Sequence, residues 1–123
     1  MTTKEVANRY YELIQMHKYE QIQNELYAPD AMSIEPENDS NLPLVVSGID
    51  ELRKKEGLFF SQVDEMFGGK MSEPIVSNFH FSQMTEMDVK MKGKERKFKG
   101  QIGVFEVRNG KIVKEQFFYD DFA

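Results

Sequence analysis

The sequence of 123 residues contains no cysteine and no tryptophan, and only four prolines. Without cysteine it forms no disulfide, presents no thiolate nucleophile and offers a metal ion no thiolate ligand. No apolar run approaches the roughly 20 residues that a membrane-spanning helix requires. The segment 1–5 lacks the apolar stretch of a signal peptide, so we expect a cytoplasmic protein with no membrane partner.

The sequence also has no excess of positively charged residues. Asp and Glu number 21 and Lys and Arg number 16, which leaves a formal net charge of −5. Because negative charge repels phosphate, we expect no nucleic-acid partner. Hydrophobic residues make up 40% of the chain and charged residues 30%. This balance is typical of folded proteins, and the length predicts one domain over residues 1–123.

The start of the chain shows helical periodicity. Thr2 and Glu5 have the spacing of a capping box, in which a hydroxyl and a carboxylate satisfy backbone amides at a helix start. The apolar face of this first helix consists of Val6, Tyr10, Leu13, Ile14 and His17. A second short helix presents Tyr19, Ile22 and Leu26. We expect it to end near Ala28, because Pro29 disfavours helical backbone in the residue before it.

A third helix is predicted after a short strand at 31–34 and a polar loop at 36–48, which is rich in Pro, Asn, Asp and Ser. Ser47 is expected to precede and cap this helix. Its apolar face consists of Ile49, Leu52, Phe59, Phe60, Val63 and Phe67. We expect the helix to end at residues 68–69, a Gly-Gly pair, because glycine tolerates the left-handed turn that often closes helices.

From Glu73 onward the hydrophobic period changes to two. Apolar and polar residues alternate over 75–82 and again over 85–92, and two more strands are predicted at 98–107 and 112–119. Residues 92–94 (Lys-Gly-Lys) and 109–110 (Asn-Gly) mark hairpin turns. Helices followed by an antiparallel meander predict the α+β class.

Several local strings occur in a familiar order. Arg9-Tyr10 lies in the first helix, residues 26–31 (LYAPDA) lead into a strand, and residues 34–36 (IEP) end it. Residues 47–52 (SGIDEL) then open the third helix, and residues 109–113 (NGKIV) form the last hairpin. Together these strings resemble the nuclear transport factor 2-like superfamily, which includes ketosteroid isomerases and SnoaL-type polyketide cyclases. The resemblance extends through nearly the whole chain.

The resemblance implies a curved antiparallel sheet wrapped around the N-terminal helices, forming a cone with a deep, mostly apolar internal pocket. Such pockets typically bind small hydrophobic molecules, so the expected partner is a small hydrophobic or aromatic metabolite. The resemblance also implies a homodimer that pairs through the sheet. Phe118 and Ile102, which we expect to point outward from the last strands, are consistent with that interface.

Two residues match catalytic positions of the isomerases. Glu35 matches their general base, a carboxylate that moves a proton between carbons next to a ketone. Tyr10 matches their hydrogen-bond donor to the developing oxyanion. The alternatives are an exposed glutamate in an acidic loop and an aromatic core residue. The isomerases' third residue, an acid, falls at Gly103, which has no side chain and makes steroid isomerase activity improbable.

Other candidates lie near the C-terminus. Asp120 falls where SnoaL-type cyclases keep their catalytic acid or base, although it could equally belong to a solvated tail. Glu115 shares a strand face with apolar residues, so its carboxylate needs a partner such as Gln101, Tyr10 or a ligand hydroxyl. The predicted ligand-binding residues are Ile14, Gln101, Phe105, Glu115, Phe117 and Tyr119.

Two functions remain open at this point. The protein is either an isomerase, cyclase or dehydratase, with Glu35 or Asp120 as the base and Tyr10 as the electrophile, or a module without chemistry that holds a ligand or mediates dimeric interactions. The missing acid at Gly103 favours the second function, whereas Tyr10 and Glu35 favour the first. The two histidines, His17 and His80, form no metal-binding pattern with the acids, so we expect no metal and no other cofactor.

Overall fold

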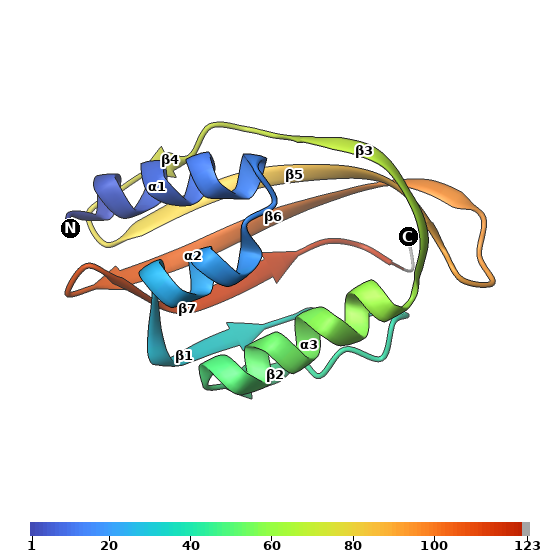
Figure 1. The fold of residues 1–123 in the computed structure, drawn as a ribbon, viewed down its shortest axis with the longest axis horizontal. Coiled ribbons are helices and arrows are strands. Elements are labelled where there is room, and N and C mark those ends of the chain that lie inside the picture. The colour runs from blue at the N-terminus through green and yellow to red at the C-terminus, as the bar shows by residue number, and fades with distance from the viewer. Residues whose placement is uncertain (122–123) are drawn as a thin grey trace.

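The computed structural model describes residues 1–121. It contains three helices and a curved, unclosed sheet of seven strands, and the helices lie along one face of that sheet (Figure 1). The elements are α1 (Thr3–Gln15), α2 (Tyr19–Leu26), β1 (Tyr27–Ile34), β2 (Val45–Ser47), α3 (Ile49–Ser61), β3 (Val63–Met71), β4 (Ile75–Val76), β5 (His80–Met91), β6 (Arg96–Arg108) and β7 (Lys111–Phe118). The predicted α+β cone is confirmed. Within the described residues, no helix is long and apolar enough to cross a membrane.

The sheet has the strand order β2-β1-β7-β6-β5-β3, and β4 pairs with one end of β5. All pairings are antiparallel except that of β1 with β7, which is parallel. We expected antiparallel pairing throughout, because local hairpin signals describe only strands that follow one another. The β1–β7 pair joins strands about 80 residues apart, with Ser33 opposite Glu115, and no turn sequence predicts its direction.

The third helix is shorter than predicted. It ends at Ser61, and the segment that begins at Val63 is strand β3, which pairs with β5 and thereby satisfies the backbone groups along that edge. The spacing of Val63 and Phe67 fits a helix, but apolar residues four apart do not by themselves distinguish the two structures. The expected terminator, the pair that begins with Gly68, lies instead inside β3, where Gly68 has φ +142° beside a shift of register.

Other boundaries also differ from the prediction. The N-cap of α3 is Gly48 rather than Ser47, and no side chain caps this helix. Strand β1 begins at Tyr27, so Pro29 lies within it, next to a register shift that tolerates its missing amide. The predicted strand at 75–82 is divided into β4 and the start of β5.

Local signals at the chain's first helix and last hairpin are confirmed. Thr2 caps α1, and its hydroxyl accepts from the Glu5 amide at 3.1 Å while the Glu5 carboxylate accepts from the Thr2 amide at 2.9 Å. Asn109 and Gly110 have φ values of +51° and +73° in the turn between β6 and β7, as a tight hairpin with two left-handed residues requires.

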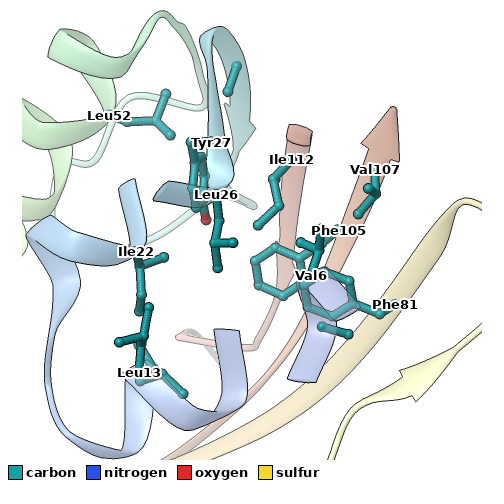
Figure 2. Close-up of a cluster of buried hydrophobic side chains, with 13 residues drawn as sticks. Val6, Leu13, Ile22, Leu26, Tyr27, Leu52, Phe81, Phe105, Val107 and Ile112 are labelled. Atoms are coloured by element: carbon teal, nitrogen blue, oxygen red, sulfur yellow. The ribbon is translucent and has the colours of Figure 1, made fainter. Parts of the chain in front are cut away.

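The hydrophobic core lies between α1, α2 and the inner face of the sheet, and most of its side chains are drawn in Figure 2. The rings of Phe81 and Phe105 stack on neighbouring strands with centroids 4.6 Å apart. Tyr10 packs on both rings from α1, at 5.7 Å and 4.8 Å. This aromatic cluster fills one end of the interior and leaves the other end to the cavity described below.

The capping box at the start of α1 leads to a stability prediction. Replacing Thr2→Ala removes the acceptor for the Glu5 amide and should lower the free energy of unfolding by about 1 kcal/mol. Chemical denaturation measured by circular dichroism tests the change. Lys4→Ala, an exposed substitution in the same turn, should alter the free energy of unfolding far less, and equal effects of the two substitutions would contradict the role of the cap.

Candidate functional site

A cavity of about 1010 Å³ lies between the helices and the sheet. Helices α1, α2 and α3 form one side, and strands β3, β5, β6 and β7 form the other. Its apolar and aromatic wall includes Ile14, Leu52, Phe59, Phe67, Met71 and Phe117. A cavity of this size and lining fits a small organic molecule that carries a few polar groups.

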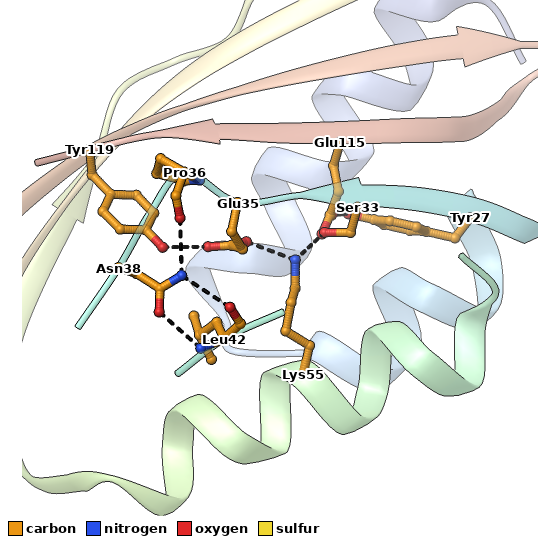
Figure 3. Close-up of polar contacts among 9 residues, drawn as sticks. All are labelled: Tyr27, Ser33, Glu35, Pro36, Asn38, Leu42, Lys55, Glu115 and Tyr119. Carbon is orange, nitrogen blue, oxygen red and sulfur yellow. Dashed lines mark hydrogen bonds and ion pairs between the residues drawn. The ribbon is translucent and has the colours of Figure 1, made fainter. Parts of the chain in front are cut away.

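A continuous chain of hydrogen bonds crosses the wall of this cavity (Figure 3). The Tyr119 hydroxyl donates to Glu35 Oε1 at 2.6 Å, and Lys55 Nζ donates to Glu35 Oε2 at 2.7 Å. Lys55 Nζ also donates to Ser33 Oγ, and that hydroxyl donates to Glu115 Oε2 at 2.6 Å. The Tyr27 hydroxyl donates to the other Glu115 oxygen. Two buried carboxylates therefore share a single ammonium group through direct and serine-mediated contacts.

Three elements bring these side chains together. Ser33 and Glu35 are two residues apart at the end of β1, so they point to the same side of the sheet. The parallel register places Ser33 opposite Glu115 of β7. Lys55 reaches Ser33 and Glu35 from α3, where it lies between the apolar residues Leu52 and Phe59. The site consequently forms only when β1 lies beside β7 and α3 packs against β1.

Burial determines the protonation states of the side chains in this hydrogen-bonded chain. The side chains of Lys55 and Glu35 are 7% and 6% exposed and form a buried ion pair. Burial raises the pKa of Glu115, although hydrogen bonds from Ser33 and Tyr27 act in the opposite direction. Burial also raises the pKa of Tyr27 well above its ordinary value, and the Glu115 charge adds to that effect. The phenol therefore stays protonated and available as a donor.

A third carboxylate, that of Glu56, lies on the cavity wall beside Lys55 in sequence. It accepts a hydrogen bond from the Gln23 side chain at 3.2 Å. Burial raises the pKa of Glu56, and the nearby charge of Glu115 raises it further. The cavity wall thus carries more acidic than basic groups around Lys55.

Most of the predicted site residues do line the cavity: Tyr10, Ile14, Glu35, Gln101, Glu115, Phe117 and Tyr119. Tyr10 and Glu35, the proposed electrophile and base, face the same hollow, although within residues 1–121 no hydrogen bond joins them. Burial raises the pKa of Tyr10, with a further contribution from the Glu115 charge. The Tyr10 hydroxyl is therefore a neutral donor at physiological pH.

Two predicted residues lie elsewhere. Phe105 is 2% exposed and packs beneath Tyr10 in the core rather than on the cavity wall. Asp120 is exposed beyond the end of β7. Its neighbour Asp121 is the buried residue of the pair, and it forms an ion pair with Lys99 at 2.6 Å. Because consecutive residues of an extended chain point to opposite sides, only one of the two can face the interior.

Sequence reasoning missed Tyr27, Ser33, Lys55 and Glu56. For Lys55 and Glu56 a signal was present, because both lie among the apolar positions of α3, where charged side chains need buried partners. For Tyr27 and Ser33 no local signal exists. Their partner Glu115 is more than 80 residues away in sequence, and only the β1–β7 pairing makes them neighbours.

The structure also explains the lack of a side chain at Gly103. This residue lies on the inner face of β6, and a Cβ atom there would be 3.0 Å from the Phe105 ring and 3.3 Å from the Phe117 ring. These aromatic rings occupy the space that an acid at this position would need. Among residues 1–121, no group of three or more histidine, aspartate or glutamate side chains is arranged to hold a metal ion.

Comparisons with solved structures identify relatives of the same architecture. A protein from Mesorhizobium loti, described as a SnoaL-like polyketide cyclase, is 30% identical, with 97% of this chain and 100% of that chain covered and a TM-score of 0.87. An NTF2-like protein from Burkholderia thailandensis is 14% identical, with 98% and 92% covered and a TM-score of 0.82. TerC, co-crystallised with polyporic acid, is 15% identical, with 96% and 91% covered and a TM-score of 0.77. The last two likenesses show the fold alone.

No curated protein matches the sequence. The family model for the SnoaL-like domain, in contrast, matches residues 1–119. That span includes the helices, all seven strands and every member of the hydrogen-bonded chain from Tyr27 to Tyr119. The chain therefore belongs to the SnoaL-like domain family, within the NTF2-like superfamily.

Proposed function

We propose that the cavity binds a small hydrophobic molecule and that Glu35 moves a proton on a carbon next to its carbonyl group. The observation that carries this proposal is the buried Glu35 carboxylate, which is held by Lys55 and Tyr119 on the wall of a large, mostly apolar cavity. Membership of a family of the polyketide cyclase and isomerase type supports the same chemistry.

The hydrogen bonds of Glu35 suit a general base. Each carboxylate oxygen accepts one bond in the free protein and has a second lone pair available. The Lys55 ammonium balances the negative charge where water is largely absent. When Glu35 removes a proton from the carbon beside the carbonyl, the C–H electron pair forms a C=C bond and the C=O π pair moves to oxygen, which gives an enolate. In an unsaturated ketone, return of the proton to the far carbon of the extended enolate isomerises the ligand. Attack of the enolate carbon on a second carbonyl closes a ring instead, and the new alkoxide then takes the proton from Glu35.

The enolate oxygen needs donors. Tyr10 offers a neutral hydroxyl at the cavity wall. Lys55 Nζ has three donor hydrogens, of which Ser33 and Glu35 accept two, so one remains for a ligand oxygen. An ammonium group in this place can supply the stabilisation that the absent acid at Gly103 does not provide.

One observation favours a second candidate function, in which the protein binds a ligand but catalyses no reaction. The family's third acid is replaced by Gly103, and the rings of Phe105 and Phe117 fill its place. Ligand binding would then depend on the apolar wall, and Glu35 would only orient a ligand hydroxyl. The two functions differ in whether a bound ketone exchanges its carbon-bound protons faster than it does in water.

Proton exchange on a ketone tests the base. We expect the protein to accelerate deuterium incorporation at the carbons beside the carbonyl of 2-tetralone in D₂O, followed by NMR. Replacing Glu35→Gln should lower this acceleration by about 10²-fold or more, because the amide cannot accept the proton. Glu37→Gln, an exposed substitution two residues farther on, serves as the control and should leave the rate unchanged. Binding of the ketone without acceleration would establish the second candidate function instead.

The protonation state of Glu115 gives a second prediction. Because burial raises its pKa, the folded-state value lies above the ordinary 4.5. Glu115 therefore makes its full contribution to the free energy of unfolding below pH 4.5. That contribution is lost as the pH rises through the folded-state pKa. Carboxyl ¹³C chemical shifts should show Glu115 titrating above 4.5. Glu25, whose pKa is lowered to about 2 by hydrogen bonds from Arg9 and Gln21, should shift in the opposite direction, and a Glu115 titration at or below 4.5 would contradict this assignment.

We also propose that the outer face of the sheet pairs two copies of the chain. Met84, Ile102 and Phe118 are direct cross-strand neighbours on β5, β6 and β7 and form an apolar row. Ile102 and Phe118 are each 49% exposed in the single chain. Apolar side chains in a contiguous row are typical of an interaction surface.

The row of Met84, Ile102 and Phe118 can be disrupted by charge. Phe118→Asp should convert a dimer into a monomer on size-exclusion chromatography with light scattering, because it would bury a carboxylate of each copy in the apolar contact. Phe79→Asp is the control, since Phe79 is 51% exposed but lies before β5 and outside the row. A dimer that survives Phe118→Asp would exclude this interface.

A further inference from the structure

We propose that the cavity contains a subsite for a positively charged amino group, formed by Glu56 with the aromatic rings of Tyr19 and Phe60. The inference rests on the proposed binding of a small molecule and narrows the class of ligand. It predicts an apolar or aromatic molecule that carries an alkylammonium group, in preference to a carboxylic acid or a purely neutral compound.

The subsite lies where α2 and α3 contact each other along the cavity wall. On α2, Tyr19 and Gln23 are one helical turn apart, and on α3, Glu56 and Phe60 are likewise one turn apart. The ring centroids of Tyr19 and Phe60 are 5.6 Å apart, and Gln23 donates to Glu56 at 3.2 Å. These two cross-helix contacts place the carboxylate and the aromatic pair on one continuous patch of wall.

The Glu56 carboxylate has spare capacity to bind a cation. It accepts one hydrogen bond, through Oε2, and within residues 1–121 nothing donates to Oε1 and no basic nitrogen lies within 4.0 Å of either oxygen. Arg53, which lies three residues before Glu56 on α3, forms its hydrogen bonds with other side chains. Its guanidinium donates to Gln23 at 2.9 Å and to Asn24 at 2.6 Å, so it orients the amide that holds Glu56.

The lysines that line the cavity are already paired with carboxylates. Lys55 pairs with Glu35, Lys70 with Glu86 at 3.4 Å, and Lys99 with Asp121 at 2.6 Å. Glu115 receives its hydrogen bonds from two hydroxyl groups. Within residues 1–121, Glu56 is therefore the cavity carboxylate that has one hydrogen bond, at 3.2 Å, and no ion pair. A ligand cation would supply the hydrogen-bond donors that it lacks.

The surroundings of Glu56 suit an ammonium group attached to an apolar body. Aromatic faces attract cations through the negative charge above the ring, and the rings of Tyr19 and Phe60 belong to the same wall as the carboxylate. The charge of Glu56 also contributes to raising the pKa of Tyr10 and Tyr19, which is consistent with both hydroxyls lying in its field. An anionic ligand would meet Glu56, Glu35 and Glu115, and of these three carboxylates only Glu35 forms an ion pair with a lysine within residues 1–121.

Three naphthalene probes of similar size test the ligand class. They are 2-naphthylmethylamine, which is positively charged at neutral pH, the neutral 2-naphthylmethanol and the negatively charged 2-naphthoate. We expect the amine to bind the full-length protein at least about tenfold more tightly than the alcohol, and the carboxylate to bind most weakly, as measured by isothermal titration calorimetry and ligand-observed NMR.

Substitutions test whether the preference for the amine comes from the subsite. Glu56→Gln should reduce the ratio of amine to alcohol affinity to within about twofold, because an amide cannot form the charged hydrogen bond. Glu51→Gln removes the same charge from the exposed side of α3 and should preserve the ratio. Tyr19→Leu should lower amine affinity more than alcohol affinity.

The outcomes separate this inference from the proposed function. If the alcohol binds and the amine gains nothing, or if Glu51→Gln abolishes the preference as fully as Glu56→Gln, the subsite is refuted while the cavity keeps its binding role. If none of the probes binds at millimolar concentration, both the subsite and the proposed small-molecule binding are refuted. Retained preference in Glu56→Gln with a correctly folded protein likewise excludes Glu56 as the amine partner.

Discussion

The buried ammonium of Lys55 is the group on which the rest of the site depends. It is the cation next to two carboxylates that the strands β1 and β7 hold inside the protein. Removing one partner of such a pair leaves an uncompensated buried charge, which typically costs about 3–5 kcal/mol. The same contact also ties α3 to the sheet, so the position of that helix and the chemistry of the cavity are determined together (Figure 3).

The cavity itself follows from how the curved sheet and the helices divide the interior. Large aromatic side chains fill the end under α1, where Tyr10 packs on Phe81 and Phe105. Toward α3 and β3 the helices and the sheet diverge, and the space between them remains open. An apolar wall with a polar chain along one side combines two properties that proton transfer on carbon needs, low water content and fixed donors.

The structure places the three positions that the resemblance matched to the isomerases in different surroundings. Glu35 and Tyr10 lie on the cavity wall as the resemblance implied. Gly103 lacks the third acid, and aromatic rings crowd its position. Lys55, which belongs to α3, brings a positive charge to the helical side of the cavity. A cation that faces carboxylates offers a different way to stabilise an oxyanion than a neutral carboxylic acid does.

Local patterns in the sequence determined the start of α1, the last hairpin, the α+β class and the inward faces of β6 and β7, because each depends on residues close together in the chain. The resemblance added the cone, Glu35 and Tyr10. Only the tertiary structure decided that β1 runs parallel to β7, that residues 63–71 form a strand, and that Ser33, Tyr27 and Lys55 meet Glu115 and Glu35. The physical reason is that a strand takes its direction, and a buried charge its partner, from groups that are remote in sequence and become neighbours only when the chain is folded.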